Sequence, residues 1–594
     1  MATVAELQTE WARLVIDSFV QAGVGDAIIS PGSRSTPFVI AALEHEGLEC
    51  TSAIDERSAA HYALGQARGA LRPSLLVCTS GSAPANYFPA VVEASEAGVP
   101  LIVLSADRPP ELHGCGANQT TDQVGLFGTK VRFFANLGEP RDDALGLRAA
   151  RRIIAQAVSE ALGAKPGPVH INAQARKPLE PVPVASELHA RVDAVLAEPL
   201  TQLHRARPLD PKLVELVPSL VTDSVAEALD SAARPVILCG PADLRSAMFV
   251  DALDELAERS GAVVLAETSS QFRCWAKSRA LGGFDAIWQT ANGRSLCRPD
   301  FVLQLGATPV SVGWERICAE ERIRRIVVHP WKWADPSSDA EAVVQADIGS
   351  FLVGLCEAEY HLNRRHPEFL PGFEWAESAV WDEVSAILEQ SGDALSQAGA
   401  ARALLDALPS PSALVLGNSL AIRDADIWAP PSDKLLLVHS QRGVSGIDGV
   451  VSGAAGVASV VEGPTTLLIG DVSFLHDING LELASRLDGP LVIVVVNNAG
   501  GQIFQQLPIA QQGKESWLSY FTTPHGADLE SAARVYGCEF ESANTVSGFR
   551  RALDSAYGRA GCTVVEALVP TQSAREQSRE LIRRVERALR SESS

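Results

Sequence analysis

The chain has 594 residues, which is several times the usual domain size and predicts about three to five domains with separate cores. Hydrophobic residues make up 46% and charged residues 21%, which is ordinary for a globular protein and excludes the disordered and fibrous classes. The formal charge of −22 disfavours nucleic acid and anionic membranes as partners, so an anionic substrate needs a local cationic site.

The beginning of the chain predicts an amphipathic helix rather than an export signal, because acids interrupt its apolar residues. The longest apolar stretch, 450–469, is broken by glycines, an acid and a proline, so it does not suit a membrane span. The ten cysteines show no CxxC or CxxH spacing, which favours reduced thiols over zinc or a redox pair. We therefore expect a cytoplasmic protein.

Short β-branched runs alternate with helical stretches along the whole chain. This alternation predicts an α/β fold with three doubly wound parallel sheets. Proline-rich stretches at 177–187 and 364–377 separate three sets of strands, and we place the domains at 1–190, 205–370 and 390–594. The predicted strands are 26–30, 74–80, 100–106, 234–240, 262–267, 301–306, 325–330, 413–418, 435–440, 465–471, 490–498 and 562–569.

Several loops that directly follow predicted strands carry arginine, which is unusual in an acidic chain. Arg34 lies in 28–38, Arg108 in 104–123, Arg423 in 417–426 and Arg442 in 440–449. Ligands of parallel sheets bind where strands end, and a guanidinium there suits a carboxylate. A single such arginine is more often a surface charge, but several at strand ends favour an anionic substrate.

A helix predicted from residue 56 carries an acid in its first turn and a face of small residues. Ala59, Ala60, Ala63 and Ala67 give that face, which suits close packing against another helix. Glu56 in the first turn either complements the helix dipole or serves chemistry. The middle strands lack a GxGxxG fingerprint, so a dinucleotide there has little support.

The pairs Gly470-Asp471 and Asn497-Asn498 end two successive predicted strands. Ile478, Leu481 and Ala484 recur at helical spacing, so Asp471 is expected in a strand-to-helix turn at the same sheet edge as Asn498. A carboxylate, an amide oxygen and the carbonyl of Gly500 suit Mg2+ together with phosphate oxygens and water. Each pair alone is also a common turn sequence.

These residues resemble the diphosphate-binding motif of thiamine-diphosphate enzymes, Gly-Asp-Gly followed by a helix and a strand ending in Asn-Asn. Val472 replaces the last glycine, as in the 2-succinyl-5-enolpyruvyl-6-hydroxy-3-cyclohexene-1-carboxylate synthases. SPGSRSTP, DER, TSGSA, ADRPPEL, GANQ, GNSL and SGIDG are similar to the same branch over residues 28–128 and 415–508. Acetohydroxyacid synthases and pyruvate decarboxylases resemble the chain less.

The resemblance implies pyrimidine-binding, central transhydrogenase-like and diphosphate-binding domains, with thiamine diphosphate and Mg2+ or Mn2+ as cofactors. It implies a transferase that decarboxylates 2-oxoglutarate and adds the succinic-semialdehyde carbanion to isochorismate in a Stetter-like 1,4-addition. The product enters menaquinone or phylloquinone biosynthesis. Glu56 is implied to face N1′ of the aminopyrimidine across a subunit interface, so a homodimer or a dimer of dimers is expected.

The resemblance also assigns residues to roles. Catalysis is implied for Glu56, Arg34, Gln119, Ser419, Arg423 and Arg442. Cofactor binding is implied for Glu56, Ser80, Ser445, Ile447, Asp471, Val472, Ser473, Asn498, Gly500, Gly501, Ile503 and Phe504, of which Asp471, Asn498 and Gly500 bind the metal. Substrate binding is implied for Ser33, Arg34, Arg108, Asn118, Gln119, Ser419, Arg423, Arg442 and Leu507. Ile503, Phe504 and Leu507 would form an apolar wall, or simply pack in the core.

One segment departs from the family pattern. Members often carry a Lys-Arg pair after the strand that corresponds to 301–306, directed at the isochorismate carboxylates, where this chain has Ser311-Val312-Gly313. Arg316, Lys277 or Arg279 is expected to substitute, or the second substrate is held differently. Two other functions stay open: a thiamine-dependent decarboxylase or carboligase of different substrate range, and a non-catalytic nucleotide-binding α/β protein.

Overall fold

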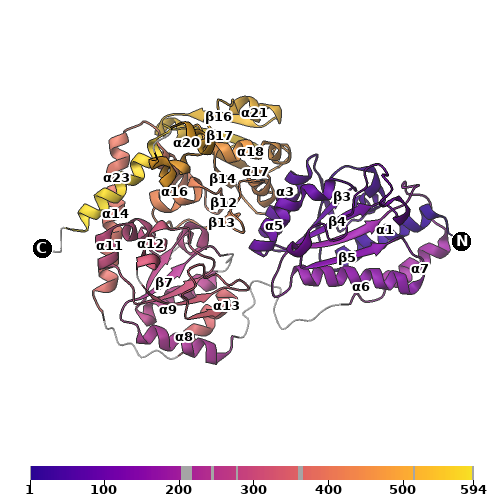
Figure 1. Ribbon diagram of the computed structural model, residues 1–594, viewed down its shortest axis with the longest axis horizontal. Helices are drawn as coiled ribbons and strands as arrows, with labels where there is room; N and C mark the ends of the chain where they lie inside the picture. The colour runs from indigo at the N-terminus through magenta and orange to yellow at the C-terminus, as the bar shows by residue number, and fades with distance from the viewer. Residues whose placement is uncertain are drawn as a thin grey trace. The chain divides into compact units, whose positions relative to one another are not determined.

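The computed structural model describes residues 2–201, 217–242, 247–275, 279–320, 322–358, 366–512 and 515–590. It contains three parallel sheets covered by helices, which confirms the predicted α/β fold (Figure 1). The chain divides into two compact units. The first comprises Met1–Ala206, Gln441–Val461 and His476–Leu487, and the second comprises Arg207–Ser440, Glu462–Leu475 and Asp488–Ser594.

The first unit is built on a six-stranded sheet of order β2-β1-β3-β4-β6-β5, with every neighbouring pair parallel. Its strands are β1 (Asp26–Ile29), β2 (Glu49–Ser52), β3 (Ser74–Cys78), β4 (Leu101–Asp107), β5 (Phe133–Gly138) and β6 (Val169–Gln174). Its helices are α1 (Val4–Gln21), α2 (Thr36–Leu43), α3 (Glu56–Ala70), α4 (Ala83–Asn86), α5 (Phe88–Ala97), α6 (Ala144–Ala161), α7 (Ser186–Leu196), α17 (Val450–Ala458) and α19 (Leu481–Ala484).

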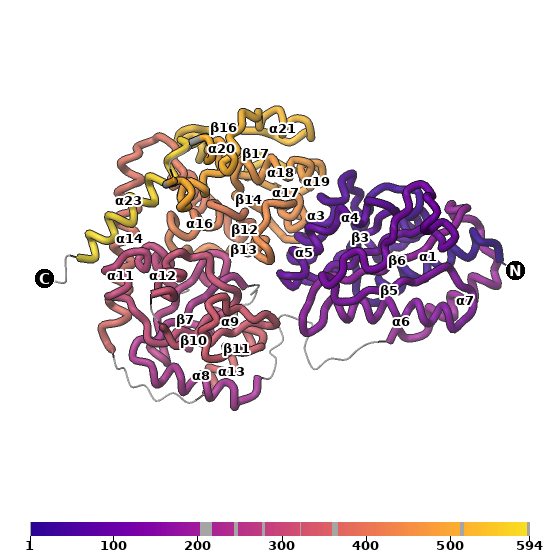
Figure 2. The backbone as a smooth tube through the Cα atoms, in the orientation of Figure 1, coloured from indigo at the N-terminus to yellow at the C-terminus, as the bar shows by residue number. Residues whose placement is uncertain are grey.

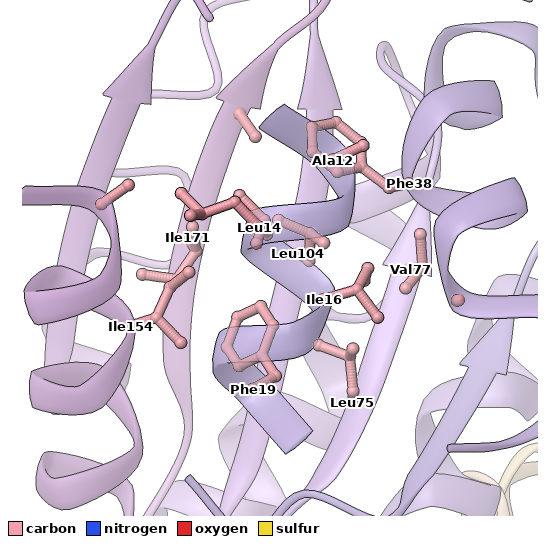
Figure 3. Packing of buried hydrophobic residues seen from close by; sticks show 14 of the residues in the cluster. Ala12, Leu14, Ile16, Phe19, Phe38, Leu75, Val77, Leu104, Ile154 and Ile171 are labelled. Carbon is pink, nitrogen blue, oxygen red and sulfur yellow. The ribbon is translucent and has the colours of Figure 1, made fainter. Parts of the chain in front are cut away.

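The core of this sheet forms because the predicted first helix is amphipathic. Thr3 and Glu6 make a capping box that starts α1, and the apolar face of the helix then lies on the sheet. Figure 3 shows Leu14 and Phe19 of α1 packed among Leu75, Leu104 and Ile171. Each fully buried side chain of this size stabilises the fold by roughly 1.5–3 kcal/mol.

Glycine allows α3 and α17 to pack closely within the first unit, where the two helices lie side by side. A Cβ on Gly65 of α3 would lie 1.9 Å from the carbonyl oxygen of Gly453 in α17. A Cβ on Gly456 would lie 2.0 Å from the carbonyl oxygen of Tyr62. The predicted alanines Ala59, Ala60, Ala63 and Ala67 are buried, but the close contact with α17 is made by Gly65, which the prediction did not include.

The second unit contains the other two sheets and their helices. The middle sheet has the order β11-β10-β9-β7-β8 and the third has β13-β12-β14-β15-β17-β16. The middle elements are α8 (Ser219–Ser231), β7 (Pro235–Cys239), α9 (Ala247–Ser260), β8 (Val263–Ala266), α10 (Phe284–Gln289), α11 (Ala291–Leu296), β9 (Phe301–Leu305), α12 (Val312–Glu320), β10 (Arg324–Val328), β11 (Ala342–Val344), α13 (Ile348–Cys356) and α14 (Phe369–Ser391).

The third sheet repeats the strand order of the first sheet: in each, the second strand lies outside the first and the sixth lies between the fourth and fifth. Its elements are α15 (Gln397–Ala407), β12 (Ser412–Leu416), α16 (Leu420–Trp428), β13 (Leu436–Ser440), β14 (Thr465–Gly470), α18 (Asp471–His476), β15 (Leu491–Asn497), α20 (Glu515–Thr522), α21 (Leu529–Val535), β16 (Glu539–Ala543), α22 (Val546–Tyr557), β17 (Cys562–Leu568) and α23 (Ser573–Ala588). The last helix, α23, packs along α14 (Figure 2).

One local prediction was wrong. The helical spacing after Asp471 does not give one helix: α18 ends at His476, and a 3-10 turn at Ile478–Gly480 precedes α19. The proline-rich segment 364–377 does lie between two sets of strands, although α14 starts within it at Phe369 and tolerates Pro371 in its first turn. All twelve predicted strands are present, and each sheet lies inside one predicted domain; the exact domain boundaries stay a prediction.

Two expectations about the chain as a whole can be compared with the structure. All ten cysteines are free thiols. Within the described ranges, every helix is too short or too polar to cross a membrane.

Candidate functional site

The carboxyl ends of β12, β14 and β15 surround a cavity of about 40 Å³. The strand order reverses between β12 and β14, and such switch points leave a crevice in which ligands of α/β sheets bind. Asp471 and Asn498 meet at this edge, as expected, because each directly follows one of two neighbouring strands. The cavity is lined by Gln397, Asn418, Ser419, Leu420, Ala421, Gly470, Asp471, Val472, Ser473, Val496, Asn498, Gly500, Gly501 and Gln502.

Asp471 is held rigidly by the backbone around it. The side chain is 1% exposed, its Oδ2 accepts the N–H of Gly500 at 2.8 Å, and its Oδ1 accepts the N–H of Val472 at 2.7 Å. Burial raises the pKa of the Asp471 carboxyl, against the lowering effect of these two hydrogen bonds. Each oxygen keeps a further lone pair for a cation, which would favour the ionised form.

Asn498 presents a buried oxygen that no described group satisfies. Its Oδ1 has no hydrogen-bond partner in the described part of the chain, while its Nδ2 donates to Oε1 of Gln397 at 3.1 Å. Nε2 of Gln397 donates in turn to Oδ2 of Asp424 at 2.7 Å. The Asp424 carboxylate accepts the NH2 group of Gln397, so the oxygen of the Gln397 amide faces Asn498. That oxygen accepts the NH2 group of Asn498, so the Asn498 oxygen is left directed at the cavity. A buried acceptor of this kind is usually satisfied by an ordered water, an ion or a ligand.

Gly500 has a backbone conformation that other residues rarely adopt. Its φ is +133°, and a Cβ would lie 2.4 Å from the carbonyl oxygen of Thr522. Its N–H is committed to Asp471, and its carbonyl accepts the N–H of Gln502 at 2.8 Å, with a second lone pair remaining. The glycine therefore allows the loop after β15 to fold back beside Asp471.

These three groups fit a hard cation. A carboxylate, an unsatisfied amide oxygen and a backbone carbonyl are the oxygen donors that Mg2+ takes alongside phosphate oxygens and water. Among the described residues there is no cluster of three or more His, Cys, Asp and Glu side chains, so a site for a softer metal is not apparent there.

His525 is a neighbour that the sequence motifs did not indicate. Its Nε2 lies 3.2 Å from Oδ2 of Asp471, without the geometry of a hydrogen bond. It lies in the segment after α20, which follows the Asn497-Asn498 motif by two 3-10 turns and a helix, so only the folded chain reveals it. Gln397 was missed for the same reason, since it starts α15 far upstream of both motifs.

A second cavity of about 860 Å³ adjoins the first, and Leu420 lines both. Arg423 lies in it, one helical turn after Ser419, and donates to the Ser419 carbonyl at 2.6 Å. Ser419 itself has a φ of +66°, a strained value for a serine. The volume falls within the roughly 300–1,000 Å³ of small-molecule sites.

Two of the three residues predicted to form an apolar wall line the larger cavity. Ile503 and Leu507 line that cavity, while Phe504 packs on Phe521 with ring centroids 5.7 Å apart. Leu507 is 44% exposed, so it is not a core residue in the single chain. Packing against Phe521 is therefore a sufficient reason for an apolar residue at Phe504, whereas the exposed Leu507 has no such packing role in the single chain.

In the first unit, the equivalent strand ends bring four predicted residues together. Ser80 follows β3, and its Oγ donates to the Gln119 carbonyl at 2.9 Å, while Nε2 of Gln119 donates back to the Ser80 carbonyl at 3.2 Å. Nε of Arg108 reaches the same Gln119 carbonyl at 3.4 Å. Arg34 is buried. Its backbone N–H donates to the hydroxyl of Thr79, the neighbour of Ser80, and its NH1 donates to the Ala175 carbonyl at 2.7 Å. Ser33 and Asn118 are exposed beside this cluster.

Glu56 is the first residue of α3, after the N-cap Asp55, as predicted. It is half-buried in the single chain. Burial raises the pKa of the Cys78 thiol and of the Tyr87 hydroxyl, and the Glu56 charge adds a smaller effect in the same direction.

The loop that follows β13 carries Arg442, Ser445 and Ile447 and is anchored in the first unit. Buried Glu93 of α5 accepts the N–H groups of Gly443 and Val444, each at 2.7 Å. Ser445 adopts a φ of +59° and is exposed, while Arg442 and Ile447 are half-buried. Glu93 was not predicted, since a lone glutamate within a helix carries no motif.

The segment Ser311-Val312-Gly313, which stands where the family often has a Lys-Arg pair, lies at the larger cavity. Ser311 and Val312 line it, and so does Arg316 one turn further along α12. Arg279 does not line the cavity, and it forms an ion pair with Glu258 at 3.6 Å. Lys277 lies outside the described residues. Three residues were expected to replace the Lys-Arg pair of the family. Of the two that the structure describes, Arg316 lines the cavity and Arg279 does not.

Comparison with known proteins matches both outer parts of the chain. Residues 9–126 match the family described as thiamine pyrophosphate enzyme, N-terminal TPP binding domain. Residues 434–567 match the corresponding C-terminal TPP binding domain. An X-ray structure from Mycobacterium smegmatis, assigned to the thiamin diphosphate-dependent enzymes, superposes with a TM-score of 0.68 and 18% identity, over 94% of this chain and 98% of that one. This likeness shows a shared fold.

Full-length relatives are closer. The chain is 42% identical to the 2-succinyl-5-enolpyruvyl-6-hydroxy-3-cyclohexene-1-carboxylate synthase of Sorangium cellulosum, over 95% of this chain and 93% of the relative. It is 40% identical to the enzyme of the same name from Geobacillus kaustophilus, over 95% of each, and 37% identical to that of Halobacterium salinarum, over 98% and 99%.

Proposed function

Because the chain belongs to the 2-succinyl-5-enolpyruvyl-6-hydroxy-3-cyclohexene-1-carboxylate synthase family, we propose that it decarboxylates 2-oxoglutarate and joins the remaining four-carbon unit to isochorismate. The cofactor is thiamine diphosphate, for which both matching domains are named. When bound, thiamine diphosphate supplies the nucleophilic carbon that takes up the 2-oxo acid and stabilises the charge left by CO2 release. The observation that carries the proposal is the unsatisfied oxygen of Asn498 beside Asp471 and Gly500.

The switch-point residues would hold the diphosphate through Mg2+ or Mn2+. Asp471, Asn498 and the Gly500 carbonyl are the proposed metal ligands, and Val472, Ser473 and Gly501 line the same cavity. A bound cation would satisfy the Asn498 oxygen and the lone pairs that Asp471 keeps. It would also offset the burial that raises the pKa of Asp471.

Glu56 is the proposed proton carrier at N1′ of the aminopyrimidine. Its role requires a pocket that excludes water, and the single chain leaves this side chain half-buried. Burial by a second subunit would complete the site, so we propose a homodimer or a dimer of dimers in which Glu56 of one subunit serves the cofactor bound by the other. Ser80, Ser445 and Ile447 are proposed to hold the cofactor alongside Glu56.

Arginine and amide groups would bind the carboxylates of both substrates. Arg34, Arg108, Gln119, Arg423 and Arg442 are the proposed donors, because charge-assisted hydrogen bonds from guanidinium groups select carboxylates in a chain that is otherwise acidic. Ser33, Asn118 and Ser419 add neutral donors, while Ile503, Phe504 and Leu507 would keep water away from the reacting carbon. A place in menaquinone or phylloquinone synthesis in the cytoplasm follows from the same proposal.

The proposal is tested by reconstitution. Protein stripped of cofactor is supplied with thiamine diphosphate and Mg2+, and loss of 2-oxoglutarate is followed with and without isochorismate. Turnover that requires all four components supports the proposal. Equal turnover without isochorismate would instead identify a decarboxylase of different substrate range, and no turnover under any condition would leave a non-catalytic protein.

A further inference from the structure

The larger cavity is lined by a row of arginines that none of the motifs contains. Arg575, Arg579 and Arg583 lie at intervals of one helical turn on α23, and Arg316 of α12 lines the same cavity. The helix α23 packs against α10 of the middle sheet and against the 3-10 turn Gln502–Gln506, which carries Ile503. Its arginines therefore belong to the wall of a cavity that Arg423 and Leu507 also line.

Two of these arginines, Arg575 and Arg579, have no acidic partner among the described residues. In the described ranges, no carboxylate lies within ion-pair distance of Arg575 or Arg579, and the buried Nε of Arg575 has no hydrogen-bond partner. Arg583 is different, because it forms an ion pair with Glu580 at 2.7 Å. Arg316 donates to the Gln289 carbonyl at 2.9 Å and keeps its other donors. Arg575 and Arg579 therefore join Arg316 and Arg423 as cations of this cavity that can bind a ligand.

Four of the five acids that line the cavity accept hydrogen bonds from other groups, whereas Glu315 of α12 is exposed. Glu267 accepts the N–H of Ser311 at 3.0 Å, and Asp285 accepts the Ser311 hydroxyl at 2.6 Å and the N–H of Gly313 at 2.7 Å. Asp426 accepts two hydrogen bonds from Thr268 at 2.7 Å. These four carboxylates are therefore bound to groups other than Arg575 and Arg579, which leaves the two guanidinium groups available to an anion.

We propose that Arg575 and Arg579, supported by Arg316, bind a carboxylate of the second substrate, a cyclic dicarboxylate. The inference rests on the proposed function, since that reaction requires such a substrate beside Arg423. Guanidinium forks bind carboxylates with two parallel hydrogen bonds, and two arginines one turn apart present their forks to the same ligand. The residues of α23 line the larger cavity and not the smaller, so they act on the substrate and not on the cofactor diphosphate.

The test measures binding without turnover. Holoenzyme with thiamine diphosphate and Mg2+ is titrated with isochorismate in a calorimeter, with 2-oxoglutarate absent, for wild type, Arg575→Gln, Arg579→Gln and the double variant. Arg587→Gln is the matched control, because Arg587 lies two turns after Arg579 on α23, is exposed and does not line the cavity. The affinity for the cofactor, measured on the same samples, reports whether each variant is folded.

Loss of a charge-assisted hydrogen-bond pair should weaken isochorismate binding roughly 10- to 100-fold in each single variant, and more in the double variant. Arg587→Gln and the KM for 2-oxoglutarate should stay unchanged. Wild-type affinity in the double variant, while wild type binds and turns over isochorismate, would overturn this inference and leave the proposed function intact. Wild type that neither binds nor consumes isochorismate would overturn both.

Discussion

Asp471 accepts the backbone N–H of Gly500 through Oδ2 at 2.8 Å, so one hydrogen bond joins two motifs that lie 29 residues apart. The bond fixes Asp471, which directly follows β14, against the loop that follows β15, and both lie at the cavity of the switch point. The proposed metal site is therefore assembled before any ligand arrives, which lowers the entropy lost on binding.

Replacing Asp471 by alanine should abolish Mg2+-dependent binding of thiamine diphosphate, because the substitution removes the only proposed anionic ligand. The loss should exceed the roughly 10- to 100-fold effect that is typical of residues outside the coordination sphere. Calorimetric titration of stripped protein measures it. Asp488→Ala, at an exposed position before β15, is the control; cofactor retention in Asp471→Ala equal to that in the control would refute the metal assignment.

Gln397 should act as a positioning residue for Asn498. In Gln397→Leu the Asn498 amide loses its acceptor and the Asp424 carboxyl loses its donor, so the oxygen that faces the cavity is no longer fixed. We expect Mg2+ affinity to fall roughly 10- to 100-fold, while saturating Mg2+ restores turnover. A Mg2+ titration of cofactor binding checks this, and an unchanged midpoint would show that Asn498 needs no such support.

Glu56→Gln should bind thiamine diphosphate and Mg2+ with nearly wild-type affinity, since Glu56 does not line the metal cavity. Turnover should fall roughly 100- to 10,000-fold through loss of acid-base catalysis. Parallel measurement of cofactor affinity and rate separates the two effects, with exposed Glu46→Gln as the control. Full activity in Glu56→Gln would remove this residue from catalysis.

Acidification should destabilise the first unit through His170 of β6. Burial lowers the pKa of this imidazole to about 3, whereas an unfolded histidine titrates near 6.5. The unfolded state therefore binds the additional proton between these values, and stability that is present above pH 6.5 is lost as the pH falls toward 3. The slope is roughly 1.4 kcal/mol per pH unit.

Thermal midpoints of wild type and His170→Gln between pH 7 and 4.5 test this linkage. The thermal midpoint of wild type should fall more steeply with decreasing pH than that of His170→Gln, because glutamine does not titrate. A gap between the two midpoints that stays constant with pH would mean that His170 has the same pKa in the folded and the unfolded protein, which would contradict this account.

Close packing of α3 on α17 should depend on glycine. In Gly65→Ala the new Cβ would meet the Gly453 carbonyl at 1.9 Å, and since both partners are backbone, the helices must separate. Such overpacking typically costs about 1–3 kcal/mol of unfolding free energy. Denaturant unfolding measures it against Gly489→Ala, where nothing lies within 4 Å of the new Cβ; equal midpoints would contradict the packing account.

Most of the fold could be predicted because central parallel strands are buried on both faces and read as apolar runs. The strands that the sequence did not reveal have a different character. Polar residues mark β2, and β11 has three residues; both are edge strands, as are β5 and β16. The fifth, β6, is buried but contains His170 and Asn172, which bond to Ser105 rather than follow an apolar pattern.

The metal site could be predicted for a related reason. Asp471 and Asn498 follow neighbouring strands, so local sequence suffices to bring them together. Gln397, His525 and the arginines of α23 come to the same region from α15, the segment after α20 and the last helix, and their positions depend on tertiary packing that no local pattern encodes.

The most direct measurement of the proposed reaction follows the carbon skeleton of the first substrate. Stripped protein is reconstituted with thiamine diphosphate and Mg2+ and given isochorismate with 2-oxoglutarate labelled at every carbon, and products are analysed by mass spectrometry and NMR. The proposed function predicts one labelled CO2 for each product molecule that carries the other four labelled carbons bonded to the isochorismate ring. Labelled CO2 with free succinic semialdehyde and unchanged isochorismate, or no labelled product at all, would contradict it.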